Sequence, residues 1–368
     1  MVSKEMNERL LQRQLSYIPR PQPYYTFDDI TYEWVASSDS IIPDASNSQL
    51  SSLVVICWNI DFMAPEPSAR MESALNYLDR LVFTIPSSSA VVILLQEMME
   101  ESYTRSPDSA KDLTQIAQAH WVQSRFNITD LDGTKWGANY GQVTLIDRRL
   151  TINQVSRLHL VSEFQRDALL VDIRLSPLEL DDQQYARTLR LCNVHLDSMV
   201  GPLRPIQWEG VAKHLQNLSV NIEASILAGD CNANSPRDWT EPHDNEFIDS
   251  YLELGGVESD EEGCTWGFQS QNWERYGRGR LDKQVYWGGV KVVKLERIGV
   301  GVEVEDVLAR RALLREGSLT FVTDHYGLMG LYDLEVNFEV RIDEKNREQE
   351  KTETDIQQEI VDKEARSV

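Results

Sequence analysis

The stretch Ser225-Ile226-Leu227-Ala228-Gly229-Asp230-Cys231-Asn232 is the part of the sequence that decides the fold prediction. Its apolar run predicts a strand buried on both faces, and Gly229 permits a tight turn at the carboxyl end of that strand. If strand geometry continues, positions i and i+2 project to the same side, so Asp230 and Asn232 share a cleft. A carboxylate there can take a proton from water, and an amide can hold a phosphate oxygen. The alternative is an ordinary turn, since Asp, Asn and Gly are common turn residues.

The charge balance limits which ligands the chain can attract. It has 368 residues, of which 59 are acidic and 36 are basic, so its formal net charge is -23. Bulk electrostatic attraction to a polyanion is therefore excluded. If the substrate is a phosphate ester, its capture requires a local basic patch, a metal ion, or both.

The cysteines and the apolar segments indicate the compartment. The four cysteines are scattered without a Cys-x-x-Cys pair, which is typical of reduced thiols and of neither a disulfide framework nor a zinc site. No apolar run approaches about 18 residues, and the polar amino terminus does not resemble a secretory signal. We expect a nuclear or cytoplasmic protein, or one present in both compartments, that is not secreted and does not bind a membrane.

The alternation of apolar runs and helical spacing predicts one large layered domain. Residues 1–50 form an N-terminal extension, residues 51–338 a catalytic domain, and residues 339–368 an acidic charged tail, with an acidic loop inserted at Pro177–Arg187. The expected strands are Leu53–Trp58, Ala90–Leu95, Gln142–Ile146, Leu150–Leu160, Ala168–Leu175, Leu189–Leu196, 225–230, Arg280–Trp287, Val290–Val302 and His325–Glu335. The expected helices are Ser68–Phe83, Leu113–Ala119, Ile206–Leu218 and Glu246–Leu254. Strands interleaved with helices in this way predict an α/β sandwich with the helices outside and the sheets within.

Polar side chains recur where the apolar runs begin or end, which is where α/β sheets hold ligands and catalytic groups. They are Asn59, Asp61, Glu97, His195, Asp197, Asp230, Asn232, Asp282, Asp324 and His325. Hard oxygen donors without a thiolate cluster select Mg²⁺ or Mn²⁺ over Zn²⁺. Taken singly, Glu97 could instead begin a helix, and each histidine could be a hydrogen-bonded structural residue.

Together these residues resemble the endonuclease/exonuclease/phosphatase superfamily. The resemblance covers about residues 52 to 337 and rests on Trp58-Asn59-Ile60-Asp61, Gln96-Glu97, Asn193-Val194-His195-Leu196-Asp197-Ser198, Gly229-Asp230-Cys231-Asn232, Arg280-Leu281-Asp282 and Thr323-Asp324-His325-Tyr326-Gly327-Leu328. The resemblance implies a four-layered α/β/β/α sandwich, with two mixed β-sheets flanked by helices. Within the superfamily, the forms of these motifs and the pair Thr265-Trp266 look most like the tyrosyl-DNA phosphodiesterase branch.

The resemblance also implies a role for each residue in a metal-assisted attack of water on a phosphodiester. Glu97, Asp61 and Asp324 would bind Mg²⁺, for which Mn²⁺ could substitute. Asp230 would deprotonate the water, and Asn232 would position the water or a phosphate oxygen. The remaining catalytic residues are Asn59 near the metal and phosphate, His195 and His325 as donors to the phosphoryl oxygens, and Asp282 as the acceptor that orients His325.

Substrate contacts are expected from Trp266, Arg204, Gln207 and Arg280. Arg204-Pro205-Ile206-Gln207 resembles an Arg-x-x-Gln of that branch, and Arg275, Arg278 and Arg280 form a basic patch beside Trp266 and Trp273, on which single-stranded ends could stack. Core packing is the alternative for both tryptophans. Two departures, Asn234 where the branch has Arg and Gly267 where it has an acid, concern substrate recognition.

The expected function is a Mg²⁺-dependent phosphodiesterase, acting as a monomer, that removes tyrosyl adducts from DNA 5′ ends and leaves a 5′-phosphate. Such a reaction belongs to the repair of topoisomerase-type lesions. The alternatives are another enzyme of the same fold, such as an abasic-site endonuclease, a deadenylase or a phosphoinositide phosphatase, and an inactive scaffold. A scaffold would show a gap in the ligand set, and the sequence shows none.

Overall fold

The computed structural model describes residues 4–37, 50, 52–100, 111–175, 187–199, 201–217 and 221–334. The predicted acidic tail at 339–368 lies outside these residues, as does the predicted insertion apart from Arg187. Within the described segments, no helix has the length and apolar character needed to traverse a lipid bilayer.

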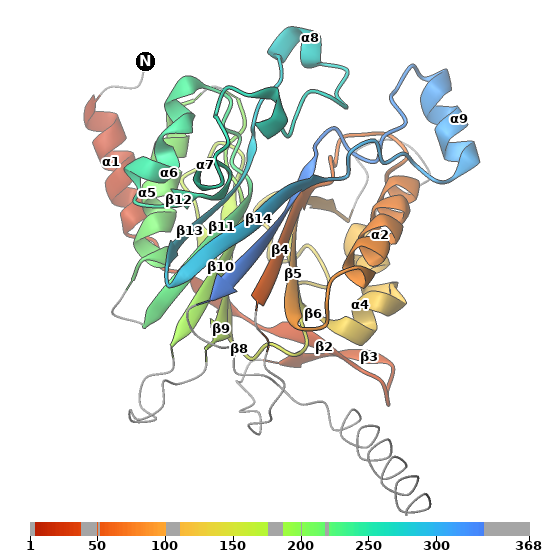
Figure 1. Cartoon of the computed structure of the whole chain (residues 1–368), viewed down its shortest axis with the longest axis horizontal. Coiled ribbons are helices and arrows are strands. Elements are labelled where there is room, and N and C mark those ends of the chain that lie inside the picture. The colour runs from red at the N-terminus through yellow and green to blue at the C-terminus, as the bar shows by residue number, and fades with distance from the viewer. Residues whose placement is uncertain are drawn as a thin grey trace, which may run out of the picture.

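Two mixed β-sheets form the centre of the fold (Figure 1). The first sheet has the order β1 (Arg20–Gln22), β8 (Ile152–His159), β9 (Asp167–Arg174), β10 (Thr188–His195), β11 (Ile222–Asp230), β13 (Asp282–Gly288) and β12 (Ile248–Asp249). The second has the order β14 (Val290–Ile298), β15 (Gly327–Leu334), β4 (Ser52–Asn59), β5 (Ser89–Met99), β7 (Tyr140–Asp147), β6 (Phe126–Ile128), β2 (Tyr24–Asp28) and β3 (Glu33–Ser37). Each sheet is mixed because one adjacent pair, β10 with β11 and β4 with β5, is parallel among antiparallel neighbours.

Helices cover the outer faces of the two sheets. In Figure 1, α1 (Lys4–Leu15) and α5 (Leu203–Leu215) lie on one side of the molecule, and α2 (Pro67–Phe83) and α4 (His120–Arg125) lie on the other. The remaining helices are α3 (Asp112–Gln118), α6 (Glu241–Asp244), α7 (Ser250–Glu253), α8 (Trp273–Tyr276) and α9 (Val307–Arg315). The predicted four-layered α/β/β/α sandwich is therefore confirmed.

Three apolar layers stabilise this arrangement. The middle layer lies between the sheets and joins residues such as Val55 and Val92 to Leu191 and Ile226. The outer layers pack α2 on the second sheet through Met71 and α5 on the first through Trp208. Because the central strands are buried on both faces, their sequences are continuous apolar runs and do not alternate between apolar and polar residues.

The register of the parallel pairs brings the polar strand ends together. His195 at the end of β10 pairs with Asp230 at the end of β11, and Asn59 at the end of β4 pairs with Gln96 in β5. The pairing of β5 with β7 shifts between Leu95 and Met98, so Glu97 lies in an irregular step of the strand. Irregular steps of this kind often redirect a side chain at the edge of a site.

Three helical segments differ from the expectations. The predicted helix at Glu246–Leu254 is instead the short strand β12 followed by the single turn α7, because residues 248–249 pair with β13. The helix predicted to start at Ile206 starts at Leu203, and α9 was not predicted. Within the predicted N-terminal extension, residues 20–37 pair with the body of the fold, since β1 joins β8 and the β2–β3 hairpin joins β6.

Candidate active site

One amide connects the carboxylates of the two sheets. The Nδ2 atom of Asn59, which ends β4, donates to Oε1 of Glu97 at 3.1 Å and to Oδ2 of Asp230 at 3.0 Å. Glu97 also accepts a hydrogen bond from the backbone N–H of Phe62 through its other oxygen, at 2.9 Å. The three side chains come from β4, β5 and β11, so the site spans both sheets.

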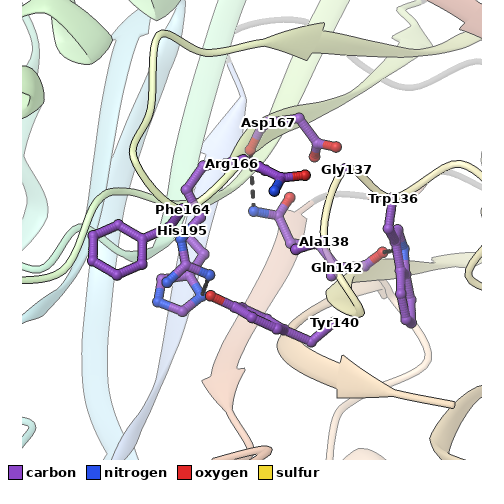
Figure 2. Close-up of a pocket in the computed structure, with 11 residues that line it drawn as sticks. Trp136, Gly137, Ala138, Tyr140, Gln142, Phe164, Arg166, Asp167 and His195 are labelled. Atoms are coloured by element: carbon purple, nitrogen blue, oxygen red, sulfur yellow. Dashed lines mark hydrogen bonds between the residues drawn. The ribbon is translucent and has the colours of Figure 1, made fainter. Parts of the chain in front are cut away.

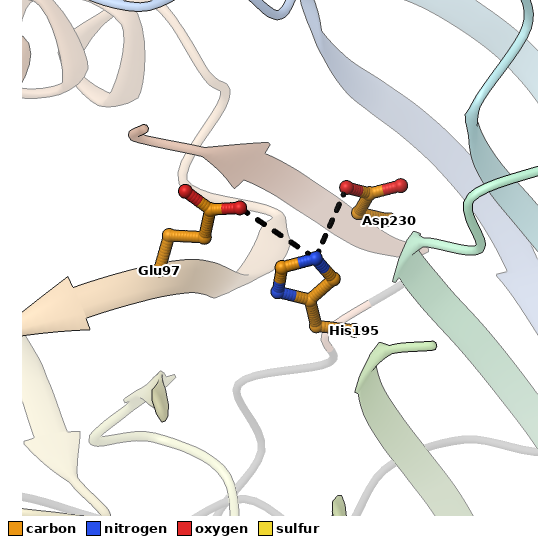
Figure 3. A group of neighbouring side chains, drawn as sticks. All are labelled: Glu97, His195 and Asp230. Carbon is orange, nitrogen blue, oxygen red and sulfur yellow. Dashed lines mark ion pairs between the residues drawn. The ribbon is translucent and has the colours of Figure 1, made fainter. Parts of the chain in front are cut away.

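His195 faces these carboxylates with one ring nitrogen and an arginine with the other. Its Nε2 atom lies 3.6 Å from Glu97 Oε1 and 3.3 Å from Asp230 Oδ2 (Figure 3). Its Nδ1 atom lies 2.9 Å from a guanidinium nitrogen of Arg166. Because a guanidinium can only donate, Nδ1 is the acceptor and the proton resides on Nε2. Burial, and then the charge of Arg166, hold the pKa of His195 well below its usual range, so the ring is a neutral donor.

His325 has the opposite environment. Its Nδ1 atom lies 2.8 Å from Oδ2 of Asp282, and its Nε2 atom lies 3.8 Å from Oδ2 of Asp230. Burial disfavours the charged ring, but the carboxylates of Asp282 and Asp230 outweigh it and hold the pKa of His325 well above its usual range. His325 is therefore an imidazolium at neutral pH, oriented by the hydrogen bond to Asp282.

Asp230 lies at the centre of the cluster. The backbone N–H of Asn232 donates to its Oδ1 at 2.8 Å, which leaves Oδ2 directed at Asn59 and at both histidines. Burial raises the pKa of Asp230; His325 lowers it in turn, and Asp282 raises it. The Asn232 side chain donates to the carbonyl of Leu196 at 3.0 Å, which fixes it beside the β10 end.

The carboxylates of the site repel one another in a way that suits a divalent cation. Burial and then the neighbouring Asp61 raise the pKa of Glu97 to about 7. Burial and then Asp324 raise the pKa of Asp61 to about 6. Glu97, His195 and Asp230 offer ligand atoms that all lie within 4.8 Å of one another. The donors are mostly carboxylate oxygens, which fit Mg²⁺ or Mn²⁺.

Three of the site residues have a left-handed backbone. The φ angles are 58° at Asp61, 62° at Glu97 and 48° at Asn232. Residues other than glycine rarely adopt this conformation, and such positions cluster at functional sites, where the surrounding structure maintains them. Asp61 also faces the guanidinium of Arg70 at 3.7 Å, and Asp324 accepts a hydrogen bond from the indole of Trp266 at 2.7 Å.

The structure does not bring Arg204, Gln207 and Arg280 to the cluster. Arg204 is 1% exposed and forms a two-point ion pair with Asp238 at 2.9 and 2.8 Å. The Gln207 amide bonds the backbone of Val161 and Asp197. Because burial and these internal partners leave no surface for a ligand, we correct the expected substrate contact of Arg204 and Gln207 to a structural role.

Arg280 requires the same correction. Its guanidinium is buried, pairs with both oxygens of Asp249 at 2.9 and 2.8 Å, and contacts Glu258. The expected basic patch therefore reduces to Arg275 within α8 and Arg278 just after it. There the Arg278 guanidinium lies 5.5 Å from the ring centre of Trp273, which is 46% exposed.

A pocket beside His195 contains residues that the sequence analysis missed (Figure 2). The Arg166 guanidinium lies 4.8 Å from the ring centre of Tyr140 and 5.4 Å from that of Phe164. Tyr140 stacks in turn on Phe62, with ring centres 4.0 Å apart. One signal was available: Arg166 and Asp167 directly precede an expected strand, as the chosen polar residues do elsewhere.

Comparisons with known proteins identify the family and the fold. The sequence profile described as the Endonuclease/Exonuclease/phosphatase family matches residues 56–325. No curated protein sequence gives a significant match.

Among solved structures, truncated Caenorhabditis elegans TDP2 has a TM-score of 0.56 at 19% identity, over 77% of this chain and 97% of that one. D. rerio TDP2 complexed with single strand DNA product has a TM-score of 0.52 at 16% identity, over 77% and 99%. An endonuclease/exonuclease/phosphatase from Bacteroides vulgatus has a TM-score of 0.51 at 12% identity, over 77% and 100%. Since the profile match takes in well over half of the sequence and the solved structures share the fold, this chain belongs to the endonuclease/exonuclease/phosphatase family.

Proposed function

We propose that the protein is a Mg²⁺-dependent phosphodiesterase that hydrolyses 5′-phosphotyrosyl DNA and leaves a 5′-phosphate. The observation that supports this most is the buried constellation in which Asn59 links Glu97 to Asp230 beside one neutral and one positively charged histidine. Glu97 would hold the metal, with Asp61 and Asp324 nearby. When bound, Mg²⁺ supplies Lewis-acid polarisation of the phosphoryl group and charge neutralisation.

Asp230 is the candidate general base. Its Oδ2 atom is the oxygen on which the Asn59 amide and both imidazoles converge, so a water held there would lie among three groups that can orient it. The raised pKa of Asp230 makes the carboxylate a better proton acceptor than an exposed aspartate. Asn232 would position the water or a phosphate oxygen.

The two histidines would bind the phosphoryl oxygens in different ways. His325, held as an imidazolium by Asp282, would offset the negative charge that develops in the transition state. His195 would donate an N–H from a neutral ring. That donor can bind a phosphoryl oxygen without forming a strong ion pair with Asp230, the candidate base. Together they supply donors in fixed positions, so little reorganisation is needed during the reaction.

The pocket beside His195 supports an aromatic leaving group. Arg166 and Tyr140 present a stacked cation and ring at the edge of the site, and a tyrosyl ring could pack against them. A phenolate, whose conjugate acid has a pKa of about 10, leaves more readily than an alkoxide and needs less protonation. The TDP2 of D. rerio in complex with a single-stranded DNA product shares the fold, which supports DNA ends as the substrate class. On this proposal the protein acts in DNA repair, as a monomer in the nucleus, the cytoplasm or both.

The test is hydrolysis of an oligonucleotide with a 5′-phosphotyrosine, in Mg²⁺, in Mn²⁺ and in EDTA. We expect release of a 5′-phosphate end with Mg²⁺ and none with EDTA. Glu97→Ala and Asp230→Asn should each lose at least about 100-fold in rate, as expected for a metal ligand and a general base. Glu253→Ala, which alters an exposed acid of α7, is the matched control.

Other outcomes would redirect the proposal. Activity on abasic duplex, poly(A) or phosphoinositides in place of the tyrosyl substrate would retain the catalytic site and replace the substrate. Tyr140→Ala should raise KM for the tyrosyl substrate by about tenfold, as the loss of one stacking partner does. An unchanged KM would remove the pocket from the proposal.

A further inference from the structure

The loop between β8 and β9, residues 160–166, carries Phe164 and Arg166 to the active site. It is closed at its base by a hydrogen bond from the Leu160 N–H to the Arg166 carbonyl, at 3.1 Å. Inside the loop, the Ser162 hydroxyl accepts from the backbone N–H of Phe164 and of Arg166, at 2.9 and 3.0 Å. The position of the Arg166 guanidinium beside His195 therefore depends on the backbone of this loop.

Two side chains from within the family-matched segment hold the loop from outside. Asp197 accepts hydrogen bonds from the Ser162 hydroxyl and, at 2.9 Å, from the Glu163 N–H. Gln207 of α5 donates to the Val161 carbonyl at 3.0 Å. These contacts leave the Val161 N–H and the His159 carbonyl to be satisfied elsewhere.

A glutamine from the amino-terminal helix satisfies both of these groups. Gln14 in α1 accepts from the Val161 N–H through Oε1 at 2.5 Å and donates to the His159 carbonyl through Nε2 at 3.2 Å. Its side chain is fully buried, and it is the single buried residue of α1. The helix lies beside α5 (Figure 1), and Leu10 and Leu11 of α1 pack on Val161 and on α5.

The neighbouring helix is adapted to this glutamine. A Cβ atom at Gly210 of α5 would lie 2.3 Å from Cγ of Gln14, closer than real Cβ contacts come. Glycine in a helix interior costs about 1 kcal/mol relative to alanine. The absence of a side chain at position 210 therefore gives Gln14 the space to reach the loop.

We propose that Gln14 is a positioning residue. From α1 it fixes the 160–166 loop, and the loop in turn holds Arg166 and Phe164 in place beside His195. The helix precedes the family-matched segment, which begins at residue 56, so this role lies outside the residues that the family profile matches. Without Gln14, a buried N–H and a partly buried carbonyl lose their partners, and the loop is expected to open locally more often.

Hydrogen exchange of the full-length protein tests the proposal without any substrate. In Gln14→Met, which keeps the side-chain length and removes both hydrogen bonds, peptides that cover residues 160–166 should exchange about tenfold faster. Gly210→Ala should do the same by displacing Gln14, although alanine favours the helix. Gln12→Ala, at an exposed glutamine of α1, is the matched control and should leave the exchange unchanged.

The kinetic arm rests on the proposed function and is separate from the exchange experiment. With bis(p-nitrophenyl) phosphate as a generic substrate, Gln14→Met should raise KM at least about threefold while kcat changes less, because substrate binding beside His195 is weakened and the carboxylates are unchanged.

Exchange of the loop at the wild-type rate in both Gln14→Met and Gly210→Ala would overturn the proposal. Equally faster exchange in β4, β5 and β11 would also overturn it, since that result would indicate general destabilisation. If the wild type does not hydrolyse the 5′-phosphotyrosyl oligonucleotide, the proposed function is wrong, but the exchange result still tests the role of Gln14.

Discussion

The two histidines of the site differ because their outer ring nitrogens meet opposite charges. Arg166 beside His195 keeps that ring neutral, and Asp282 beside His325 keeps that ring charged. A phosphoryl group placed between them would meet one neutral and one charged donor. The chemistry of the site is thus determined by the partners of the histidines as much as by the histidines themselves.

Asp282→Asn should shift the alkaline limit of activity to lower pH. The pKa of His325 is raised in the folded protein, so its charge is complete below about 6.5 and is lost as pH rises through the folded value. Asparagine keeps an acceptor but removes the charge that sustains this value, so kcat at about pH 8 should fall about tenfold to a hundredfold. The measurement is a pH–rate profile, with Asp333→Asn at an exposed position of β15 as control. A profile that keeps its alkaline limit would contradict the pairing.

Stabilisation by Mg²⁺ should increase with pH. The pKa of Glu97 rises to about 7 on folding from an ordinary value of 4.5, so the metal-free protein loses stability as pH rises between these values. A cation relieves this repulsion and competes with the proton on Glu97 at lower pH. The difference in Tm with and without Mg²⁺ should therefore be larger at about pH 8 than at about pH 5.5. In Glu97→Gln most of this dependence should vanish; an equal Tm shift at both pH values in the wild type would argue against Glu97 as a ligand.

Much of the site could be predicted from strand ends, and the errors have a common cause. Asn59, Glu97, His195, Asp230, Asp282 and His325 were chosen because each stands beside an apolar run, and the structure brings all six together. Arg204 and Arg280 were misjudged because an arginine looks the same in sequence whether its partner is a ligand or a distant carboxylate. Asp238 and Asp249, which neutralise them, lie 34 and 31 residues away. Arg166 was missed because its significance depends on the ring of Tyr140, which only the fold brings near.

Among the elements, β10 and β11 end side by side at the candidate catalytic residues His195 and Asp230, and their close contact depends on one glycine. Gly229 has φ +140°, and a Cβ there would lie 2.1 Å from the carbonyl oxygen of Val194 in β10. Any side chain must therefore push the parallel pair apart directly before His195 and Asp230.

Gly229→Ala should lower the free energy of unfolding by about 3 kcal/mol, from the unfavourable backbone conformation and overpacking together. It should also reduce activity more than stability alone explains, because the strand ends separate. Denaturant unfolding and steady-state kinetics measure the two effects. Gly255→Ala, with φ +91° and open space around it, is the control and should cost only about 1 kcal/mol. Equal effects of the two substitutions would show that the close approach to β10 is unimportant.

The elements that the sequence predicted well include a strand buried on both faces and a helix with regular apolar spacing. The run Leu53–Trp58 and the helix Ser68–Phe83 reappear as β4 and α2 within one residue at each end. The pair β12 and α7 was mistaken for one helix because two residues of β12 gain their conformation only by pairing with β13. The residues around a short strand do not indicate which distant strand it will pair with, so short edge strands were the least predictable part of the fold.

For the whole molecule, the formal charge of -23 opposes any nucleic acid that approaches. Near α8 the exposed partners for phosphate are Arg275 and Arg278, and Arg278 already contacts Glu261. Recognition must then rely on the metal, the histidines and the aromatic side chains more than on a basic groove.

The salt dependence of the reaction should therefore be weak. Each phosphate contact on a single strand contributes about -0.7 to the slope of log affinity against log salt, so two arginines give about -1.4. Screening of the long-range repulsion acts in the opposite direction. We expect log(kcat/KM) for the tyrosyl oligonucleotide to fall with a slope shallower than about -1.4 at fixed Mg²⁺. A slope steeper than about -4 would reveal a larger cationic surface.

The strands within residues 20–37 also cover one edge of each sheet of the body. β1 covers the edge of β8, and the β2–β3 hairpin covers the edge of β6. A chain that began near Leu50 would leave both edges with unpaired backbone groups, which are templates for strand exchange and aggregation. Such a shortened chain could keep all the candidate catalytic side chains and still precipitate, so it would lose solubility before it lost the geometry of the candidate site.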